Sequence, residues 1–292
     1  MARVKEFRVL VASDGSLSAI AATVTAARFP WPAGARAVGV VAREASNGRR
    51  SPLKEAFEQA ARSTAESATQ ALLSRWPDVR VRVAIGPPAN AIVQAAKRAR
   101  ADVIAMGWRG HGAVRRLLAG SVSRAVVRSA PCAVLVVRRA VQNVRTVVVG
   151  VDGSEQSTRA VQFAARLQPP EGARMLLLTA APLMSDPSHP LLPAEIRRSA
   201  AAGVASINRA RVVDARANLA RLAAVARAAG WRVDVAVKNA APLRSLLAAV
   251  SESGADLLVV GATGATQLRQ LLLGSVAQGA LDRSPVPVLI VR

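Results

Sequence analysis

The strongest constraint on how this chain folds is an internal duplication, because three blocks of sequence recur in the same order. The matching pairs are residues 7–16 (FRVLVASDGS) with 145–154 (RTVVVGVDGS), 101–121 (ADVIAMGWRGHGAVRRLLAGS) with 255–275 (ADLLVVGATGATQLRQLLLGS), and 131–138 (PCAVLVVR) with 285–292 (PVPVLIVR). The 292 residues therefore form two copies of one unit, each long enough to bury its own core. We place the boundary at Gln142, which predicts domains of residues 1–142 and 143–292.

The second copy is longer than the first. The interval from the Asp of the first block to the first Gly of the second block grows from 93 residues (Asp14 to Gly107) to 109 residues (Asp152 to Gly261). Most of the added length falls around Leu183–Ala202, where Pro, Ser and Arg residues predict a longer surface loop.

Each copy alternates strand-like and helix-like segments. In the first copy the strands are expected at Arg8–Ala12, Ala37–Val41, Val79–Ile85, Asp102–Met106 and Ala133–Val137, and the helices at 16–28 (with Ser16 or Ser18 as N-cap), Pro52–Arg75, Ala89–Arg100 and Val114–Arg128. Continuous apolar strands separated by helices predict a parallel sheet covered on both faces, so each copy should be a doubly wound α/β domain. Because ligands bind beyond the carboxyl ends of such strands, the Asp14 and Gly107 turns should lie close together.

Composition narrows the function classes. The formal charge of +22 invites a nucleic-acid interpretation, but 36 of the 40 cations are arginines, they are scattered, and aromatic residues make up 3% with no Tyr. Nucleic-acid binding is therefore disfavoured. Apolar runs such as Met175–Met184 are shorter than the ~20 residues of a membrane span, and no secretory signal is visible. With a single cysteine, Cys132, these features predict a cytoplasmic protein that does not associate with membranes.

One glycine motif carries the chemistry. Gly107-x2-Gly110-x9-Gly120-Ser121 in the first copy is repeated with identical spacing as Gly261-x2-Gly264-x9-Gly274-Ser275. Glycines after a strand allow close approach of a ligand, and a Gly-Ser pair that opens a helix offers free backbone N–H groups to an anion. Neither a Walker motif nor a dinucleotide fingerprint is present. The spacing fits a phosphate site. The alternatives are that it reflects duplicated turn geometry or that Gly120-Ser121 marks a break in a helix.

With these blocks the sequence resembles the universal stress proteins, specifically members with two such domains in one chain. The resemblance covers nearly the whole chain and rests on the Asp-Gly-Ser turn, the glycine motif and the Pro-led last strand. The glycine pattern is the family's ATP-binding signature. The resemblance implies a five-stranded parallel sheet in each domain, ATP or another adenine nucleotide at the carboxyl ends of the strands, pairing of domains through their last strands, and a role in stress survival.

The resemblance also implies which residues bind the nucleotide. Around the base and ribose of the first copy it places Ala12, Ser13, Asp14, Val41, Met106 and Gly107, and around the phosphates Gly110, Gly120, Ser121, Val122 and Ser123. The equivalent residues of the second copy are Gly150, Val151, Asp152, Thr179, Val260, Gly261, Gly264, Gly274, Ser275 and Val276. Apolar strand ends for a base, a carboxylate for its donors and glycine backbone for phosphate agree with this assignment. Mg²⁺ is a candidate companion of the phosphates.

The two loops differ where phosphate charge would lie. The first contains Arg109 and His111, and the second contains Thr263 and Ala265 at the same places. Because charge-assisted hydrogen bonds are the stronger ones, the first site is predicted to bind nucleotide more tightly, with Arg109 beside the phosphates. Trp108 is expected to be exposed in its loop, to contact a partner or to cover the nucleotide, and Cys132 is expected to be a small core residue.

The resulting hypothesis is an ATP-binding universal stress protein that acts as a nucleotide-responsive switch. Without a visible nucleophile, carboxylate pair or metal cluster, turnover would be at most slow ATP hydrolysis. The alternatives are a scaffold protein whose glycine loops are structural, and a polyanion or nucleic-acid binder. The terminal strands Ala133–Val137 and Pro287–Val291 could pair within one chain or in a homodimer, and a protein partner is expected but unidentified.

Overall fold

The computed structural model describes residues 6–44, 52–110, 119–185, 193–264 and 273–292. The first copy contains β1 (Arg8–Ser13), α1 (Leu17–Arg28), β2 (Arg36–Arg43), α2 (Pro52–Leu73), β3 (Val81–Ile85), α3 (Pro88–Ala99), β4 (Val103–Gly107), α4 (Ser121–Ser129) and β5 (Ala133–Val137). The second contains β6 (Thr146–Gly150), α5 (Glu155–Ala165), β7 (Arg174–Ala180), α6 (Ala194–Ala228), β8 (Arg232–Lys238), α7 (Pro242–Ser253), β9 (Leu257–Gly261), α8 (Ser275–Arg283) and β10 (Val288–Val291). Both copies therefore follow the predicted alternation of strand and helix.

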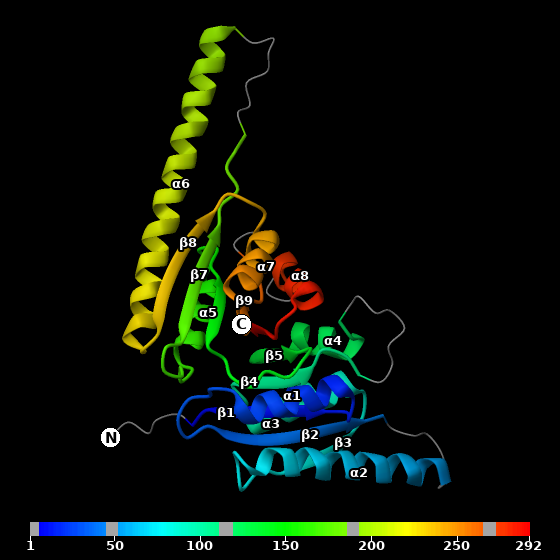
Figure 1. The fold of residues 1–292 in the computed structure, drawn as a ribbon. Coiled ribbons are helices and arrows are strands. Elements are labelled where there is room, and N and C mark those ends of the chain that lie inside the picture. The colour runs from blue at the N-terminus through cyan, green and yellow to red at the C-terminus, as the bar shows by residue number, and fades with distance from the viewer. Residues whose placement is uncertain (1–5, 45–51, 111–118, 186–192, 265–272) are drawn as a thin grey trace.

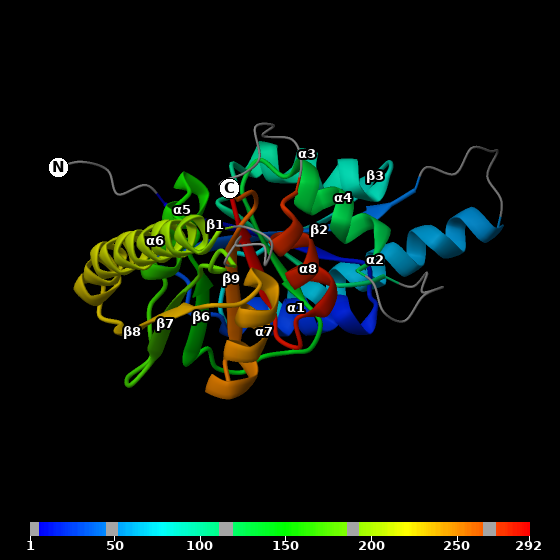
Figure 2. The same ribbon diagram turned by 90° about the horizontal axis from the view of Figure 1, so that it is seen from above.

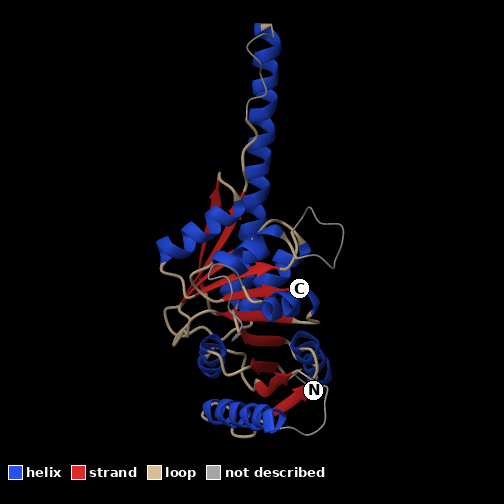
Figure 3. Ribbon diagram, turned by 90° about the vertical axis from the view of Figure 1, so that its right-hand side faces the viewer, coloured by secondary structure: helices blue, strands red, loops and turns tan. Residues whose placement is uncertain are grey.

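The strands form one continuous sheet in the order β3-β2-β1-β4-β5-β10-β9-β6-β7-β8 (Figure 3). Within each copy all five strands run parallel, as predicted. The copies join where β5 and β10 pair antiparallel, with Leu135 opposite Leu289. The expected pairing of the last strands is thus made inside one chain. Because β5 and β10 have neighbours on both edges, neither offers an edge to a second copy.

Helices cover both faces of the sheet, because alternate strand residues point to opposite sides. Residues such as Val9 and Val11 pack with α1, α2, α5 and α6, whereas Leu10 and Ala12 belong to the cluster with α3, α4, α7 and α8. Each cluster includes residues of both copies, so the core continues across the junction. Figures 1 and 2 show the two sets of helices around the sheet.

The first helix of each copy begins at the serine of the Asp-Gly-Ser turn. The Ser16 side chain accepts a hydrogen bond from the Ala19 backbone N–H at 3.3 Å, which confirms the predicted N-cap, and Ser154 caps α5 in the same way at 3.1 Å. The preceding glycine, Gly15, has a φ of +80°, a conformation that side chains disfavour. The turn that carries Asp14 is therefore held from both sides.

Two predicted elements were wrong in extent. The helix expected at Val114–Arg128 begins at Ser121 after a Gly120 N-cap, although residues 111–118 lie outside the described residues. The loop expected around Leu183–Ala202 gives way at Ala194 to α6, a helix of 35 residues that projects from the sheet (Figure 1). Alanine and arginine favour helix there more strongly than the Pro and Ser residues favour a loop.

The prediction that Trp108 is exposed is also wrong. Its side chain is 8% exposed, and the indole Nε1–H donates a hydrogen bond to the Leu281 carbonyl of α8 at 2.7 Å. The guanidinium of Arg138, at the end of β5, lies 3.7 Å from the ring centroid and donates to the Asp282 carbonyl at 2.7 Å. The first copy's glycine loop is thus fastened to the last helix of the second copy.

The Asp282 carboxylate accepts three hydrogen bonds at this junction. It accepts from Arg124 at 2.8 Å, from Gln278 at 2.8 Å and from the Ala119 backbone N–H at 3.1 Å. Burial alone would raise its pKa, but these hydrogen bonds and the Arg124 charge outweigh burial and lower the pKa of Asp282 below its ordinary value.

A carboxylate whose pKa is lower in the folded chain than in the unfolded chain stabilises the fold at pH values above its unfolded pKa of about 3.9. That stabilisation is lost as the pH falls through the pKa of the folded state. At neutral pH we expect Asp282→Asn to lower the free energy of unfolding by about 1–3 kcal/mol. In denaturant titrations the difference between the parent chain and the variant should shrink as the pH falls from 7 towards 3. A constant difference over that range would contradict this role of the charge.

Candidate functional site

A cavity of about 290 Å³ opens at the carboxyl ends of the strands in the second copy. It lies where the Asp152 turn, the glycine loop after β9 and the helices α7 and α8 meet. Its lining comprises Gly150, Val151, Asp152, Ser157, Leu178, Ala180, Pro242, Leu246, Val260, Gly261, Thr263, Gly264, Gly274, Ser275, Val276 and Ala277. The predicted convergence of the Asp-Gly turn and the glycine motif at one sheet edge is therefore confirmed.

Nine of the ten residues predicted for this copy line the cavity, and Thr179 does not. Its neighbours in β7, Leu178 and Ala180, do, because side chains alternate along a strand. Val41 holds the same position in the first copy, where it packs with Ala61 and Ala65 of α2 on the opposite face of the sheet. At these two positions the side chain points to the opposite face of the sheet and the backbone remains on the ligand's side, so the expected contact of Val41 with the base stays a prediction.

Seven lining residues are not among the ten predicted for this copy. They are Ser157, Leu178, Ala180, Pro242, Leu246, Thr263 and Ala277. Pro242 and Leu246 are four residues apart at the start of α7 and therefore lie on one face of that helix. The spacing was visible in the sequence, but only the packing of α7 against β6 and β7 directs that face into the cavity.

The first glycine of each motif is required by packing. A Cβ added to Gly107 would lie 2.7 Å from the backbone of Ser18 and Ala19 in α1, and one added to Gly261 would lie 3.0 Å from Gln156 in α5. These positions point away from the α7 and α8 side of the sheet, so glycine is needed there to let the first helix approach. This glycine therefore has a packing role, and because Gly261 also lines the cavity a ligand role beside it stays a prediction.

The second glycine of each motif lies against the carboxylate of the Asp-Gly-Ser turn in the same copy. A Cβ on Gly110 would lie 2.4 Å from Asp14 Oδ2, and one on Gly264 would lie 2.8 Å from Asp152 Oδ2. Only the tip of a side chain would be displaced, so this glycine keeps room for the carboxylate and for whatever the carboxylate binds. A Cβ added to the third glycine, Gly120 or Gly274, would lie 3.3–3.4 Å from backbone atoms of the loop.

The helices that follow the glycine loops begin without a side-chain cap. Gly120 and Gly274 are the N-caps of α4 and α8 and supply no side-chain hydrogen bond, in contrast to the serines that cap α1 and α5. The backbone N–H groups of the first turn, from Ser121 or Ser275 onwards, therefore have no capping side chain. Such a helix end favours an anion, both through these donors and through the helix dipole.

The aspartates serve the turn with one oxygen. Asp14 Oδ1 accepts from the Ser16 N–H at 3.0 Å, and Asp152 Oδ1 accepts from the Ser154 N–H at 3.0 Å and from its hydroxyl at 2.6 Å. The other oxygen, Oδ2, faces the second glycine of the motif. The turn role and a ligand role are therefore compatible in the same side chain.

The first copy arranges its predicted residues around the same sheet edge. The side chains of Ala12 and Met106 belong to the core cluster beneath α3 and α4, Val122 packs partly against that cluster, and Ser13 Oγ accepts from the Gly15 N–H at 3.3 Å. The Ser123 hydroxyl donates to the carbonyls of Trp108 and Gly120, each at 2.9 Å, so it braces the loop.

Arg109 has a defined environment in the first loop. Its guanidinium carbon lies 4.0 Å from the Trp108 ring centroid, and its backbone carbonyl accepts from Ser16 Oγ at 3.0 Å. Its contact with phosphates, and tighter binding by this copy, stay predictions. His111 and Ala265, which occupy matching positions in the two glycine loops, lie outside the described residues.

Other candidate chemistry is sparse. Cys132 is half-buried at the start of β5, and burial, then the charge of Asp102, raises the pKa of its thiol to about 12 despite the opposing charge of Arg292. Among the described residues, no three His, Cys, Asp or Glu side chains gather as a metal site, and no helix has both the length and the apolarity of a membrane span.

Comparison with known proteins agrees with this geometry. The universal stress protein family matches residues 7–138 and 143–292. The universal stress protein in the QAH/OAS sulfhydrylase 3′ region of Thermus aquaticus is 45% identical over 86 residues, which cover 30% of this chain and 61% of that protein. One from Mycobacterium tuberculosis strain H37Rv is 28% identical over 204 residues, covering 66% and 62%. This chain therefore spans less than two thirds of the length of these relatives.

A solved structure extends the comparison to the whole fold. The crystal structure of a universal stress protein from Archaeoglobus fulgidus superimposes with a TM-score of 0.69 at 19% identity, covering 98% of this chain and 96% of that one. The duplicated blocks, the two five-stranded parallel halves of the sheet and the family match to both copies lead to one conclusion. This chain belongs to the universal stress protein family.

Proposed function

We propose that this chain binds ATP or another adenine nucleotide at the carboxyl ends of its strands and acts as a nucleotide-responsive switch in stress survival. The observation that carries the proposal is the cavity of about 290 Å³ in the second copy, in which the glycine motif, Asp152 and an uncapped helix N-terminus converge. The equivalent residues of the first copy, around Asp14 and Gly110, are proposed as a second site.

The lining divides into parts that suit the parts of a nucleotide. Leu178, Leu246 and Val260 supply an apolar wall for the base, and Asp152 supplies an acceptor for amine or hydroxyl donors. The absent side chains of Gly264 and Gly274 leave room for the phosphates beside the first turn of α8. There the N–H groups from Ser275 onwards would donate to phosphate oxygens, and Mg²⁺ would enter with the phosphates.

The same lining favours binding over turnover. Among the described residues that form it, Asp152 is the single carboxylate, and no histidine or cysteine is present. Asp152 Oδ1 is already engaged by the Ser154 hydroxyl, so a strong general base is lacking. Hydrolysis of bound ATP is therefore proposed to be slow, which suits a switch that responds to nucleotide levels in the cytoplasm.

The test is to identify the bound molecule directly. We expect the purified chain, once denatured, to release an adenine nucleotide that mass spectrometry identifies, with up to two molecules per chain. The nucleotide-free chain, refolded or washed, should bind ATP in calorimetry with a dissociation constant well below about 1 mM. Release of no nucleotide, together with no ATP binding up to that concentration, would favour a scaffold whose glycine loops are structural.

A further inference from the structure

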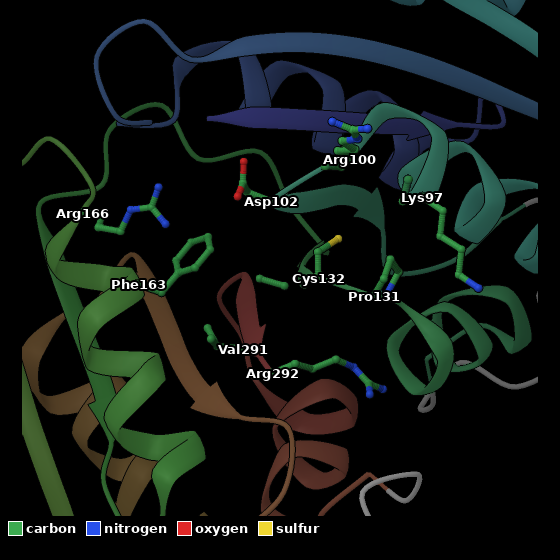
Figure 4. A pocket seen from close by; sticks show the side chains of 12 residues that line it. Lys97, Arg100, Asp102, Pro131, Cys132, Phe163, Arg166, Val291 and Arg292 are labelled. Atoms are coloured by element: carbon green, nitrogen blue, oxygen red, sulfur yellow. The ribbon is translucent and has the colours of Figure 1, made fainter. Parts of the chain in front are cut away.

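A second cavity, of about 490 Å³, lies at the junction between the copies (Figure 4). The first copy contributes the end of α3 and the residues that precede β4 and β5, and the second contributes the end of α5 and the last residues, Val291 and Arg292. In the first copy this is the edge of the sheet opposite the Asp14 and Gly107 turns. No lining residue is shared with the cavity proposed to bind nucleotide.

Positive charge dominates this cavity. Lys97, Arg100, Arg166 and Arg292 line it, against one carboxylate, Asp102 (Figure 4). Asp102 already accepts a hydrogen bond from the Arg8 backbone N–H at 2.9 Å. In the described part of the chain, none of the four cations forms a salt bridge with a carboxylate. Cations of both copies therefore line this cavity against a single carboxylate, and Lys97, Arg100 and Arg166 are exposed to solvent.

Arg292 is held in place at the rim, where its guanidinium donates to the Val127 and Arg128 carbonyls at the end of α4. One terminal nitrogen of its guanidinium donates to the Val127 carbonyl at 2.7 Å. Its Nε is buried and has no hydrogen-bond partner among the described residues.

Arg100 occupies a backbone position that suits glycine. Its φ of +50° is the one positive value of a non-glycine residue in the described chain. In the second copy the same helix end has Gly254 with a φ of +59°, and Ser251 stands where the first copy has Lys97. The first copy thus holds a cation at this cavity against the local preference of the backbone.

We propose that this junction cavity binds a compact anion that carries two or more phosphate groups. Its volume lies within the range of small-molecule sites, and its cations approach from two domains, which suits several phosphate groups rather than one. Arginine and lysine donate charge-assisted hydrogen bonds to phosphate oxygens. A ligand bound there would contact both copies and would strengthen their association.

Inorganic tripolyphosphate is the probe, and Arg100→Gly is the decisive variant. Glycine fits the backbone of position 100, so the midpoint of urea unfolding should stay equal or rise while a lining cation is lost. In calorimetry at low salt we expect the parent chain to bind tripolyphosphate and Arg100→Gly to bind it at least about 10-fold more weakly. Arg98→Ala is the matched control, because it removes an exposed cation of α3 that does not line the cavity, and it should change affinity by less than about 2-fold.

A further variant separates this site from the glycine loops. Gly264→Val, which fills the mouth of the other cavity, should leave the Arg100-dependent binding unchanged. The proposal is overturned if the parent chain binds no tripolyphosphate up to about 1 mM. It is also overturned if Arg98→Ala and Arg100→Gly weaken binding equally, or if Gly264→Val weakens binding and Arg100→Gly does not. Nucleotide binding by Arg100→Gly is measured separately, so failure here leaves the proposed function intact.

Discussion

Replacing Trp108 by alanine is expected to lower the free energy of unfolding by about 3–5 kcal/mol. The side chain is almost fully buried between the copies, and truncation would open a cavity there. It would also leave the Leu281 carbonyl without its donor and remove the ring on which the guanidinium groups of Arg109 and Arg138 lie. Urea unfolding followed by circular dichroism would measure the loss.

Trp108→Phe is the matched control for this prediction. It keeps an aromatic ring between the arginines but cannot donate to Leu281, so its loss should be smaller, about 1–3 kcal/mol. Because Trp108 joins the two copies, both variants should also raise the rate at which proteases cleave between them, near Gln142. A loss below about 1 kcal/mol for Trp108→Ala would show that the indole contributes little to the junction.

Gly264→Val is expected to weaken nucleotide binding to the second copy by at least about 100-fold, or roughly 2.7 kcal/mol. The new Cβ would lie 2.8 Å from Asp152 Oδ2, so the carboxylate must move, and the added methyl groups would occupy the cavity beside the glycine loop. Stability should change little, because the displaced atom is the tip of a side chain rather than backbone. Calorimetry with ATP and urea unfolding measure the two effects separately.

Gly261→Ala, three residues earlier in the same loop, should give the opposite pattern. Its Cβ would lie 3.0–3.2 Å from Gln156 and the Ser157 backbone, so we expect a stability loss of about 1–3 kcal/mol. Nucleotide affinity of the folded fraction should fall much less than in Gly264→Val. If Gly264→Val binds nucleotide as the parent chain does, the cavity of the second copy is not the site.

The local rules predicted most of the elements of the fold. Strand alternation and the cap at Ser16 gave β1 and α1 almost to the residue, since both depend on neighbours in sequence. The start of α4 at Ser121 and the length of α6 were missed because apolar periodicity continues through Gly120 and because helix propensity outweighs Pro and Ser near 194–202.

The candidate site was predicted where the motif itself forms the lining, and less well where other elements complete it. Leu246 lines the cavity only because α7 packs on the same side of the sheet as α8, and local sequence does not state which helices share a side. For Val41 the sequence predicted a contact but no face, and only the register of β2 shows that its side chain points towards α2.

By itself, the sequence determined the duplication, the two parallel five-stranded units and the convergence of Asp152 with Gly264, because these follow from periodicity and spacing within one copy. The tertiary structure alone decided that β5 and β10 pair within one chain, that Trp108 is buried, and that Arg100 and Arg292 line one cavity. The physical reason is that these contacts join residues from different copies. Their geometry depends on how two finished domains pack, which no local pattern of hydrophobicity or turn chemistry encodes.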